Sequence, residues 1–404
     1  MKVLQINCVY KKGSTGKIVE DIHSVLLSKG IKSVICYGRG VKINEPFVYK
    51  TSTELEAKLN NLKARFGGLQ YGGCIFATNK LLGIIKKEKP DVVHLHCING
   101  FFVNIYKLLD FLKNNDIPTI LTLHAEFMHT GSCGHSYECN KWKTGCGHCP
   151  DLKNATYSRT FDQTARAWKK MKHAFDGFKK LEIVSVSPWL MERAKQSPIT
   201  ENFSHSVILN GINCDVFRPC GSGELRKKLN LENKYVIVHV TASFKSAAKG
   251  GQYIRDLAKR LGDKAVIVVI GSYEKAENLP GNIIDIGRVE SREKLAEYYS
   301  MADLSVIAGK KETFAMPVAE SLCCGTPVAG FKAGGPETIS IPEYSGFAEY
   351  GNVDELEKIV RSFMSRKFNR EEIAESAEKK YSGKRMAEEY TDVYIKMFEK
   401  GRHK

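Results

Sequence analysis

The stretch ETFAMPVAESLCCGTPVAG, residues 312–330, decides how the chain is interpreted. It contains two glutamates, Glu312 and Glu320, separated by seven residues. Pro317 favours the first turn of a helix, Gly325 favours its end, and the apolar run that follows predicts a buried strand. The first backbone N–H groups of such a helix attract anions. One carboxylate before the helix and one within it therefore suit a ligand that carries both hydroxyl groups and phosphate.

An ordinary amphipathic helix with two solvated glutamates would show the same spacing, so the rest of the chain has to decide. The 404 residues are too many for one core and predict two domains of about 200 residues each. A content of 43% hydrophobic and 26% charged residues is typical of a globular protein, and no window approaches the ~18 apolar residues of a membrane span. The chain runs at once into a strand pattern with no signal-peptide core, so we expect a cytoplasmic protein.

Short apolar runs alternate with helical patterns along both halves, which predicts parallel sheets covered on both faces. The fold class we expect is α/β, with two Rossmann-like, doubly wound domains and their ligands at the carboxyl ends of the strands, in the cleft between the domains. A turn-rich passage at 202–222 predicts the boundary. The predicted strands are 3–10, 32–38, 91–97, 119–126, 182–187 and 206–211 in the first half, and 235–243, 264–271, 282–287, 304–309 and 326–331 in the second.

Positive charge is concentrated in the first half. Residues 1–200 hold 30 Lys and Arg against 16 Asp and Glu, whereas the remainder holds 31 against 29. A basic half beside a nearly neutral one suggests an anionic partner. We rank a membrane surface or an anionic acceptor first, solubility second and nucleic acid third.

Further motifs follow one another in a characteristic order: GSTGK at 13–17, NGINCDVFRP at 210–219, the pair Lys249-Gly250, CGTPV at 324–328 and AGGPETI at 333–339. With the two glutamates, they resemble the retaining GT-B glycosyltransferases, in particular glycosyltransferase family 4. The resemblance implies an acceptor-side domain at 1–204, a donor-binding domain at 205–384, and a last helix, 385–404, that returns to the first domain. It also implies a UDP-type or GDP-type sugar donor and no cofactor or divalent metal for catalysis.

The same resemblance assigns the donor contacts. Gly16 would lie against the donor diphosphate, and Lys249 would compensate the charge that builds on the departing nucleoside diphosphate. The family usually has an arginine five or six positions before this lysine; here Ser243 and Phe244 stand there, and Lys245 is the nearest substitute.

The two glutamates take different roles in the resemblance: Glu312 positions the donor sugar and Glu320 accepts hydrogen bonds from the ribose. Ala315 stands where the family usually has glycine. The other expected donor contacts are the backbone of Thr313, Phe314, Ala315 and Met316, and the nucleobase frame of Arg288 and Val289.

In the first half, TLHAE places His124 and Glu126 at a strand end. Many relatives read His-Asp here, so the acidic group is displaced by one position. His124 is expected to contact donor sugar or acceptor, with His96 and Glu126 on the acceptor side. A histidine satisfied within the core is an equally good interpretation of His124.

Four of the twelve cysteines crowd into GSCGHSYECNKWKTGCGHCP, residues 131–150. The spacing Cys133-x5-Cys139-x6-Cys146-x2-Cys149 suits a structural zinc ion bound by four thiolates. Free thiols and disulfides are the alternatives. A related loop occurs in a subset of bacterial family 4 enzymes, and we expect it to shape the acceptor side.

The sequence as a whole predicts a retaining glycosyltransferase, peripheral on the inner face of the cell membrane. It would move a sugar to a glycan acceptor such as a lipid-linked precursor of capsule, exopolysaccharide or O-antigen. A sugar-nucleotide epimerase of the same fold is one alternative. A basic zinc-binding nucleic-acid protein is another, but it leaves the glutamate segment unexplained, so no nucleic-acid partner is expected.

Overall fold

The chain forms two compact units. The structure is a computed structural model that describes residues 1–221, 223–274 and 277–402, the side chains of 154 and 155 excepted. One unit comprises Met1–Leu209 with Met386–Lys404, and the other comprises Asn210–Arg385. These divisions lie close to the expected domain bounds, 1–204 and 205–384. Ser222, in the expected boundary passage, and His403 and Lys404, in the expected last helix, fall outside the described residues.

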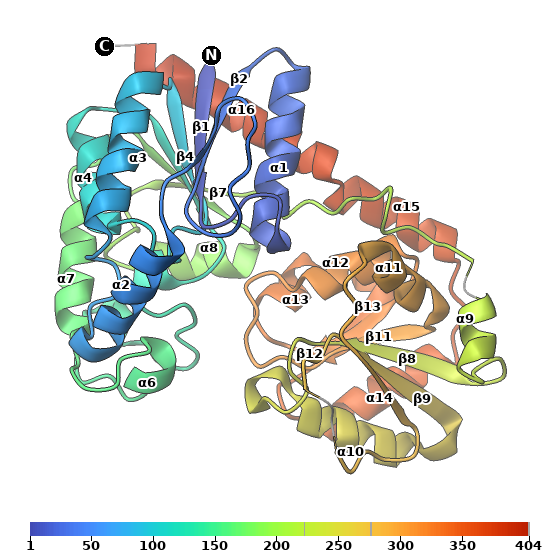
Figure 1. The fold of residues 1–404 in the computed structure, drawn as a ribbon. Coiled ribbons are helices and arrows are strands. Elements are labelled where there is room, and N and C mark those ends of the chain that lie inside the picture. Colours follow the sequence, from blue (N-terminus) through green and yellow to red (C-terminus); the bar gives the residue numbers. More distant parts are fainter. Residues whose placement is uncertain (222, 275–276, 403–404) are drawn as a thin grey trace. The chain divides into compact units, whose positions relative to one another are not determined.

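The first unit is built on a seven-stranded sheet in the order β3-β2-β1-β4-β5-β6-β7 (Figure 1). All neighbouring strands are parallel, so their carboxyl ends meet at one edge. The strand order reverses beside β1, which is where such sheets bind ligands. The strands are β1 (Lys2–Asn7), β2 (Lys32–Tyr37), β3 (Val48–Lys50), β4 (Val92–Leu95), β5 (Thr119–Leu123), β6 (Leu181–Ser185) and β7 (Ser204–Val207).

Helices cover this sheet. Apolar side chains of α1 and α16 pack with residues of β1, β4, β5 and β6 into one core. Elsewhere in the unit α3 packs on α4, and α4 on α7. The helices are α1 (Gly13–Ser28), α2 (Glu54–Gly67), α3 (Ile75–Glu88), α4 (Ile105–Asn114), α5 (Phe127–Thr130), α6 (Leu152–Ala155), α7 (Thr164–Phe175), α8 (Pro188–Lys195) and α16 (Gly383–Arg402).

The second unit has a six-stranded parallel sheet in the order β10-β9-β8-β11-β12-β13. Its core joins apolar residues of the strands with those of α10 and α14. The strands are β8 (Tyr235–Val240), β9 (Ala265–Ile270), β10 (Ile283–Gly287), β11 (Leu304–Ile307), β12 (Val328–Phe331) and β13 (Ser345–Ala348). The helices are α9 (Gly223–Lys228), α10 (Gly251–Leu261), α11 (Arg292–Met301), α12 (Met316–Cys323), α13 (Gly335–Ile339), α14 (Val353–Met364) and α15 (Arg370–Tyr381).

Ten of the eleven predicted strands coincide with observed strands to within a few residues, while the one predicted at 206–211 shares only Ser206 and Val207 with β7. Two strands were missed. Both are edge strands: β3 has three residues, and β13 reads Ser-Gly-Phe-Ala. An edge strand need not be a continuous apolar run, so neither gives the pattern of a buried strand.

The last helix packs on the first unit, as expected. From Met386 onward α16 contributes Tyr390, Tyr394 and Met397 to the core around β4 and β5. None of the helices in the described ranges is both long enough and apolar enough to cross a bilayer.

Candidate functional site

The second unit brings Lys249 and Glu312 together. The Lys249 ammonium lies 2.6 Å from Oε1 of Glu312, across 63 positions of sequence. The side chains are 41% and 25% exposed, so the pair is accessible to a ligand. Backbone bonds fix Glu312: its N–H donates to the Ala333 carbonyl and its own carbonyl accepts from Gly335 N–H. Of the three residues predicted to carry the chemistry, Lys249 and Glu312 are therefore neighbours, and His124 belongs to the first unit.

Close backbone contact holds the lysine at the carboxyl end of the sheet. Lys249 ends a single 3-10 turn, Ala247–Lys249, and Gly250 follows with φ of 76°. A Cβ atom at Gly250 would lie 2.0 Å from the carbonyl oxygen of Ala308, just beyond β11. Only glycine fits this approach, which explains the Lys-Gly pair.

The segment between the two glutamates turns sharply into α12. Ala315 precedes the helix with φ of 68°, in the left-handed region. The resemblance leads us to expect glycine there, and the backbone gives the reason, because a Cβ atom is disfavoured at this angle. Thr313 and Phe314 are buried, and the Met316 sulfur lies 4.0 Å from Nδ2 of Asn210. Whether their N–H groups contact a donor stays a prediction.

Glu320 lies within α12 and is only partly exposed. Its Oε2 accepts a hydrogen bond from the Tyr299 hydroxyl at 3.1 Å. Burial raises the pKa of Glu320 to about 7, although the Tyr299 hydrogen bond and the charge of Arg292 act in the opposite direction. The carboxyl group therefore changes its charge near neutral pH, and its anionic form is an acceptor for hydroxyl donors.

Two tyrosines that the sequence did not single out belong to this region. Tyr299 is the partner of Glu320. Tyr273 follows the end of β9, is 68% exposed, and its ring centre lies 4.7 Å from the guanidinium carbon of Arg288. An exposed ring with a cation stacked on it suits a planar ligand. The one available signal was the position of Tyr273 directly after a predicted strand.

The remaining second-unit predictions gain less support. Lys245 is exposed and pairs with Glu277, 3.3 Å away, and not with Glu312. Val289 follows Arg288 and is partly buried. Nothing in these contacts tests a role in donor binding, so both assignments stay predictions.

In the first unit, Gly16 lies in the first turn of α1, after the end of β1. It is buried, and a Cβ atom there would lie 3.2 Å from Cγ2 of Val9. The N-cap residue Lys12 makes no side-chain capping bond, and the first turn holds no acidic residue. Such a helix end is suited to an anion, and the contact with a diphosphate stays a prediction.

The histidines of the first unit form an array at the ends of β4 and β5. The rings of His94 and His96 lie 3.8 Å apart between centres, and those of His96 and His124 lie 5.7 Å apart. Nδ1 of His96 is 3.4 Å from Nε2 of His124, and its Nε2 is 3.2 Å from Oε1 of Gln5. His94 hydrogen bonds to the Tyr394 hydroxyl at 2.6 Å. The array ties α16 to the strand ends.

Burial governs the charge of these rings. It lowers the pKa of His124 to about 4, and the pKa values of His94 and His96 fall well below the usual range. All three are therefore neutral at pH 7. His124 is partly exposed, whereas His96 is 1% exposed. His96 lies just beyond the end of β4 and is enclosed by its neighbours, and its assignment to the acceptor side stays a prediction.

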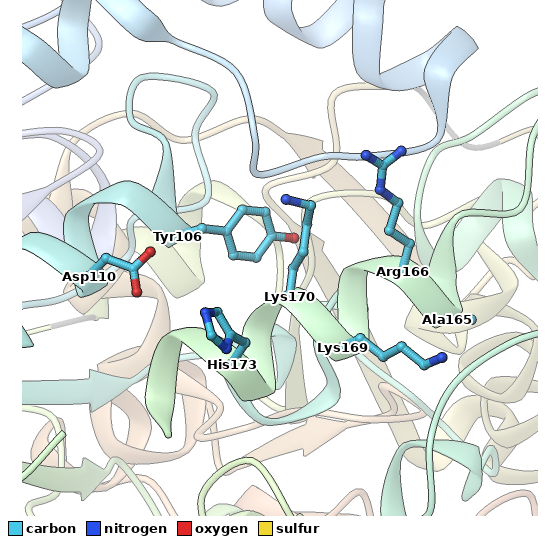
Figure 2. Close-up of a pocket in the computed structure, with 7 residues that line it drawn as sticks. All are labelled: Tyr106, Asp110, Ala165, Arg166, Lys169, Lys170 and His173. Carbon is cyan, nitrogen blue, oxygen red and sulfur yellow. The ribbon is translucent and has the colours of Figure 1, made fainter. Parts of the chain in front are cut away.

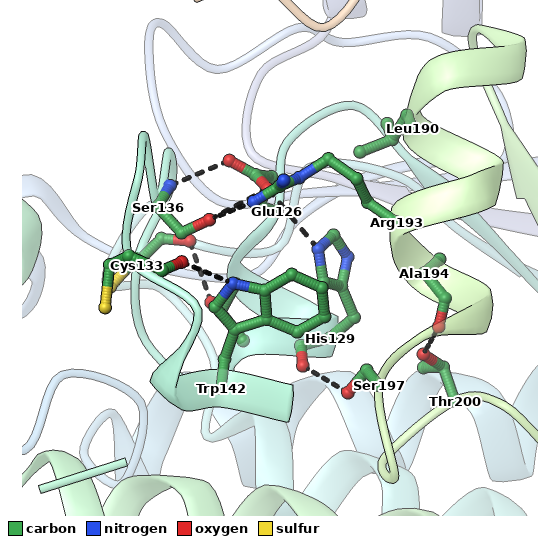
Figure 3. A network of polar contacts seen from close by, with 12 residues as sticks. Glu126, His129, Cys133, Ser136, Trp142, Leu190, Arg193, Ala194, Ser197 and Thr200 are labelled. Carbon is green, nitrogen blue, oxygen red and sulfur yellow. Dashed lines mark hydrogen bonds and ion pairs between the residues drawn. The ribbon is translucent and has the colours of Figure 1, made fainter. Parts of the chain in front are cut away.

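Glu126 was also expected on the acceptor side; its side chain turns to protein partners, and a contact with an acceptor stays a prediction. The side chain is fully buried and accepts hydrogen bonds from Ser136 N–H at 2.7 Å and from Nε of Arg193 at 2.5 Å (Figure 3). The strand ends at Leu123, so Glu126 begins a new helix and no longer follows the strand alternation.

Electrostatics keep this carboxylate charged. Burial alone would raise the pKa of Glu126, but the His129 ring, the Arg193 guanidinium and the Ser136 N–H outweigh it and lower the pKa to about 2. Arg193 lies over the rings of Trp142 and Trp189, 5.0 and 5.1 Å from their centres. Glu126 thus anchors the cysteine-rich loop to α8.

The four cysteines of this loop share one neighbourhood. A charge on Cys139, Cys146 or Cys149 would raise the pKa of Cys133, and burial raises the pKa of Cys146 to about 12. Across the described residues, however, no three His, Cys, Asp or Glu side chains are gathered as metal ligands. The thiols do not form a ligand set in this arrangement, and the zinc site stays a prediction.

Comparison with known proteins finds sequence similarity to glycosyltransferases. Residues 222–380 match the family described as Glycosyl transferases group 1. The putative colanic acid biosynthesis glycosyl transferase WcaC of Escherichia coli K12 is 24% identical to the chain over 416 residues, covering 98% of the chain and 99% of that protein.

Solved structures share the fold. Sucrose-phosphate synthase from Thermosynechococcus elongatus superposes with a TM-score of 0.69 and 14% identity, over 99% of the chain and all of that structure. Anabaena Alr3699/HepE, solved in complex with UDP-glucose, gives 0.65 and 15%, over 98% of the chain and all of that structure. The expected fold, with two Rossmann-like domains of GT-B type, is confirmed.

Proposed function

We propose that this chain, which carries a group 1 glycosyltransferase domain on a GT-B fold, is a retaining enzyme of glycosyltransferase family 4 type. It moves a sugar from a nucleotide donor to a glycan acceptor at a membrane surface. The observation that carries the proposal is the 2.6 Å pair of Lys249 and Glu312 beside the helix that bears Glu320.

Each of these residues suits one part of a nucleotide sugar. The Lys249 ammonium offsets the charge that develops on the leaving diphosphate, and Glu312 holds sugar hydroxyls and keeps the lysine in place. Glu320 accepts hydrogen bonds from the ribose, and Tyr273 with Arg288 offers a stacking surface to the base. In the reaction, the bond from the anomeric carbon to the diphosphate oxygen breaks, and the acceptor oxygen bonds to that carbon on the same face. The acceptor proton passes to the leaving phosphate oxygen, so neither a protein base nor a metal is needed.

The first unit is proposed to bind the acceptor near His124, the partly exposed member of the histidine array. A neutral imidazole can donate or accept a hydrogen bond to a sugar hydroxyl. The nature of the acceptor is suggested by the WcaC relative, which is named as a putative glycosyl transferase of colanic acid biosynthesis. We infer a precursor of a cell-surface polysaccharide, carried on a lipid.

The thermal stability of the purified protein with UDP, GDP, ADP, CMP and their common sugars tests the donor site. A ligand at ~100 times its dissociation constant adds about 2.7 kcal/mol to the free energy of unfolding. One nucleotide family should stabilise the wild type and not Glu320→Ala, while the exposed control Glu375→Ala keeps the effect. Stabilisation by none of the nucleotides contradicts the proposal. Sugar release that never yields an acceptor product would favour the epimerase instead.

The face of the protein that we propose binds the membrane is an apolar face on α2. Leu55, Leu59, Leu62 and Phe66 recur at helical spacing and are between 51% and 69% exposed. A soluble helix normally turns such a stripe toward the core. At the start of α3, Ile75 and Phe76 are 63% and 81% exposed.

Hydrogen bonds join the two helices into one face. The Ala77 N–H of α3 donates to Oε1 of Glu56 at 3.2 Å, and Cys74 N–H donates to Oδ1 of Asn60 at 3.0 Å. The apolar residues at the start of α3 therefore adjoin the stripe on α2. An exposed apolar patch of this kind marks an interaction surface.

The positive charges beside this apolar face favour an anionic bilayer as the partner. Seven cationic residues of the stretch 54–89 are exposed: Lys58, Lys63, Arg65, Lys80, Lys86, Lys87 and Lys89. The glutamates of the same stretch turn to protein partners, as Glu54 does to Nε of Arg39 at 2.9 Å and Glu88 to the Tyr49 hydroxyl at 2.7 Å. Each cation near an anionic surface contributes about 1 kcal/mol, and apolar side chains add insertion into the interface.

Sedimentation with phosphatidylglycerol vesicles tests this face. The double variant Leu59→Asn, Leu62→Asn should bind at least tenfold more weakly, with the net charge unchanged. Leu27→Asn with Val41→Asn is the matched control, because both residues are exposed leucine or valine side chains elsewhere in the same unit. Equal loss in both double variants, or strong binding to neutral phosphatidylcholine vesicles, would count against a specific anionic docking face.

A further inference from the structure

A basic pocket lies between α4 and α7 in the first unit, and the proposed transfer reaction makes no use of it. Its volume is about 620 Å³. The lining residues, labelled in Figure 2, come from α4 (Tyr106 and Asp110) and from α7 (Ala165, Arg166, Lys169, Lys170 and His173). The spacing is helical on both sides, i and i+4 on α4, and i, i+3, i+4 and i+7 on α7, so both helices present one face to the pocket.

The Tyr106 hydroxyl is the most informative group in this pocket. The side chain is 8% exposed, and its hydroxyl has no hydrogen-bond partner among the described residues. A buried hydroxyl without a partner has given up its hydrogen bonds to water with nothing in return, so such groups are rare and call for an explanation. In Figure 2 the hydroxyl points toward Lys170, whose ammonium lies 5.5 Å from the centre of the tyrosine ring. The missing partner is therefore expected on the pocket side.

The charges around this hydroxyl favour an anion. Arg166, Lys169 and Lys170 are exposed cations on consecutive turns of α7. Asp110, the acidic residue of the lining, pairs with Lys113 at 3.3 Å and so does not neutralise them. A guanidinium group, two ammonium groups and a hydroxyl group line this one pocket, and each is a donor suited to phosphate oxygens.

We infer that this pocket binds a phosphate-bearing ligand, with Tyr106 donating a hydrogen bond to a phosphate oxygen and Arg166, Lys169 and Lys170 balancing its charge. None of its lining residues is among those assigned to the donor. The loop that leads into α7 also holds Phe161, which is 63% exposed and lies five residues before Arg166. A phosphate carried on a lipid would thus find apolar and cationic groups close together.

Calorimetric titration with pyrophosphate tests the site. The protein to use is the Lys249→Gln variant, in which diphosphate binding at the donor site is weakened. Arg166→Gln, Lys169→Gln, Lys170→Gln added to it should weaken pyrophosphate binding more than tenfold. The same change at Lys86, Lys87 and Lys89 removes equal charge from the same unit and should have less than a threefold effect.

The single variant Tyr106→Phe isolates the hydroxyl. It should weaken pyrophosphate about threefold to tenfold, as the loss of one hydrogen bond to a charged group does, while the circular dichroism spectrum and melting temperature stay those of the parent. An unchanged affinity in Tyr106→Phe, or retained binding in the triple glutamine variant, would overturn the proposal. Because the titration contains no nucleotide or acceptor, a failed transfer assay leaves its outcome unaffected.

Two probes separate the sources of the phosphate. Glycerol 3-phosphate and short-chain dihexanoyl phosphatidic acid carry the same phosphate without and with a lipid tail. Tighter binding of the lipid, lost in the triple glutamine variant, identifies a lipid headgroup, and equal affinity identifies a soluble phosphate. Both results support the site. If neither probe binds, the proposal is contradicted.

Discussion

The Lys249 ammonium and a carboxylate oxygen of Glu312 lie 2.6 Å apart, although 63 positions separate them in the chain. A partly exposed ion pair of this kind contributes at most about 1 kcal/mol to stability. We propose that its value lies instead in catalysis: the pair holds a positive charge ready beside a carboxylate that binds sugar hydroxyls.

Replacing Lys249 with glutamine should thus separate activity from stability. We expect kcat to fall about 10²-fold to 10³-fold, as it does when one preorganised charge or donor is lost from a transition state, with the free energy of unfolding changed by less than about 1 kcal/mol. Steady-state kinetics and urea denaturation measure the two quantities. Lys264→Gln, an exposed lysine in the same unit, is the control. A large stability loss with a proportionate activity loss would assign Lys249 to structure alone.

Glu320 should give donor binding a pH dependence. The anionic carboxylate accepts hydrogen bonds from ribose hydroxyls more strongly than the neutral acid does, and the pKa of Glu320 is raised to about 7. The dissociation constant of the preferred nucleotide should therefore fall by up to about tenfold between pH 6 and pH 8. Glu320→Gln should bind more weakly and without this dependence; a parallel profile in the variant would place the titration elsewhere.

The unliganded protein should show the opposite trend. A carboxyl group whose pKa is higher in the folded state stabilises the fold fully below its unfolded pKa of about 4.5, and this stability is lost as the pH rises through about 7. The free energy of unfolding should fall by roughly 2 kcal/mol more in wild type than in Glu320→Gln between pH 5 and pH 8. Urea titrations at both pH values measure the difference, and identical slopes in the two proteins would contradict it.

Ala315→Gly should stabilise the protein. Ala315 has φ of 68°, where glycine avoids a cost of about 1 kcal/mol, partly offset by the entropy that glycine adds to the unfolded chain. We expect a net gain of about 0.5 kcal/mol by urea denaturation. Ala319→Gly, inside the same helix, should lose about 1 kcal/mol and serves as the matched control. A loss at both positions would show that the alanine is accommodated without strain.

The carboxylate of Glu126 should matter for stability at neutral pH. Glu126→Gln leaves Arg193 without its counter-ion in a mostly buried setting, at a cost of about 3 kcal/mol. The pKa of Glu126 is lowered to about 2, so its stabilisation is present above about pH 4.5 and is lost as the pH falls toward 2. Wild type and variant should therefore converge in acid, and a constant difference between pH 7 and pH 3 would rule out this ion pair as the cause.

The cysteine-rich loop has a direct test in metal content. If Cys133, Cys139, Cys146 and Cys149 bind zinc, the purified protein should contain one equivalent, and Cys146→Ser should lower both zinc content and thermal stability. Cys36→Ser, a buried cysteine outside the loop, should alter stability alone. Metal content that is the same in Cys146→Ser as in wild type would exclude the site.

The sequence predicts most of this fold because parallel strands are buried on both faces and appear as plain apolar runs. What it does not predict has local causes. The edge strand β13 contains Ser345 and Gly346 and lacks that pattern. Glu126 lies beyond the last residue of β5, where alternation no longer tells which way a side chain points.

The residues of the candidate site also fall into those that the sequence predicted and those that it did not. Residues fixed by local backbone chemistry, such as Gly250 and the start of α12, were found in the sequence. Partners supplied from distant segments were not: Tyr299 reaches Glu320 across 21 positions, and Arg193 reaches Glu126 across 67. Local sequence patterns do not show which distant residues come into contact, because such contacts depend on how the elements pack.

The return of α16 to the first unit also determines the order in which the two units can finish folding during synthesis. The hydroxyls of Tyr390 and Tyr394 hydrogen bond to Thr122 and His94, which are both buried. These partners leave the ribosome more than 260 residues after the strands that need them. The second unit, continuous from Asn210 to Arg385, can be complete before then. The half of the protein that is translated first is thus the last to be finished, and during that interval its sheet is exposed to chaperones and proteases.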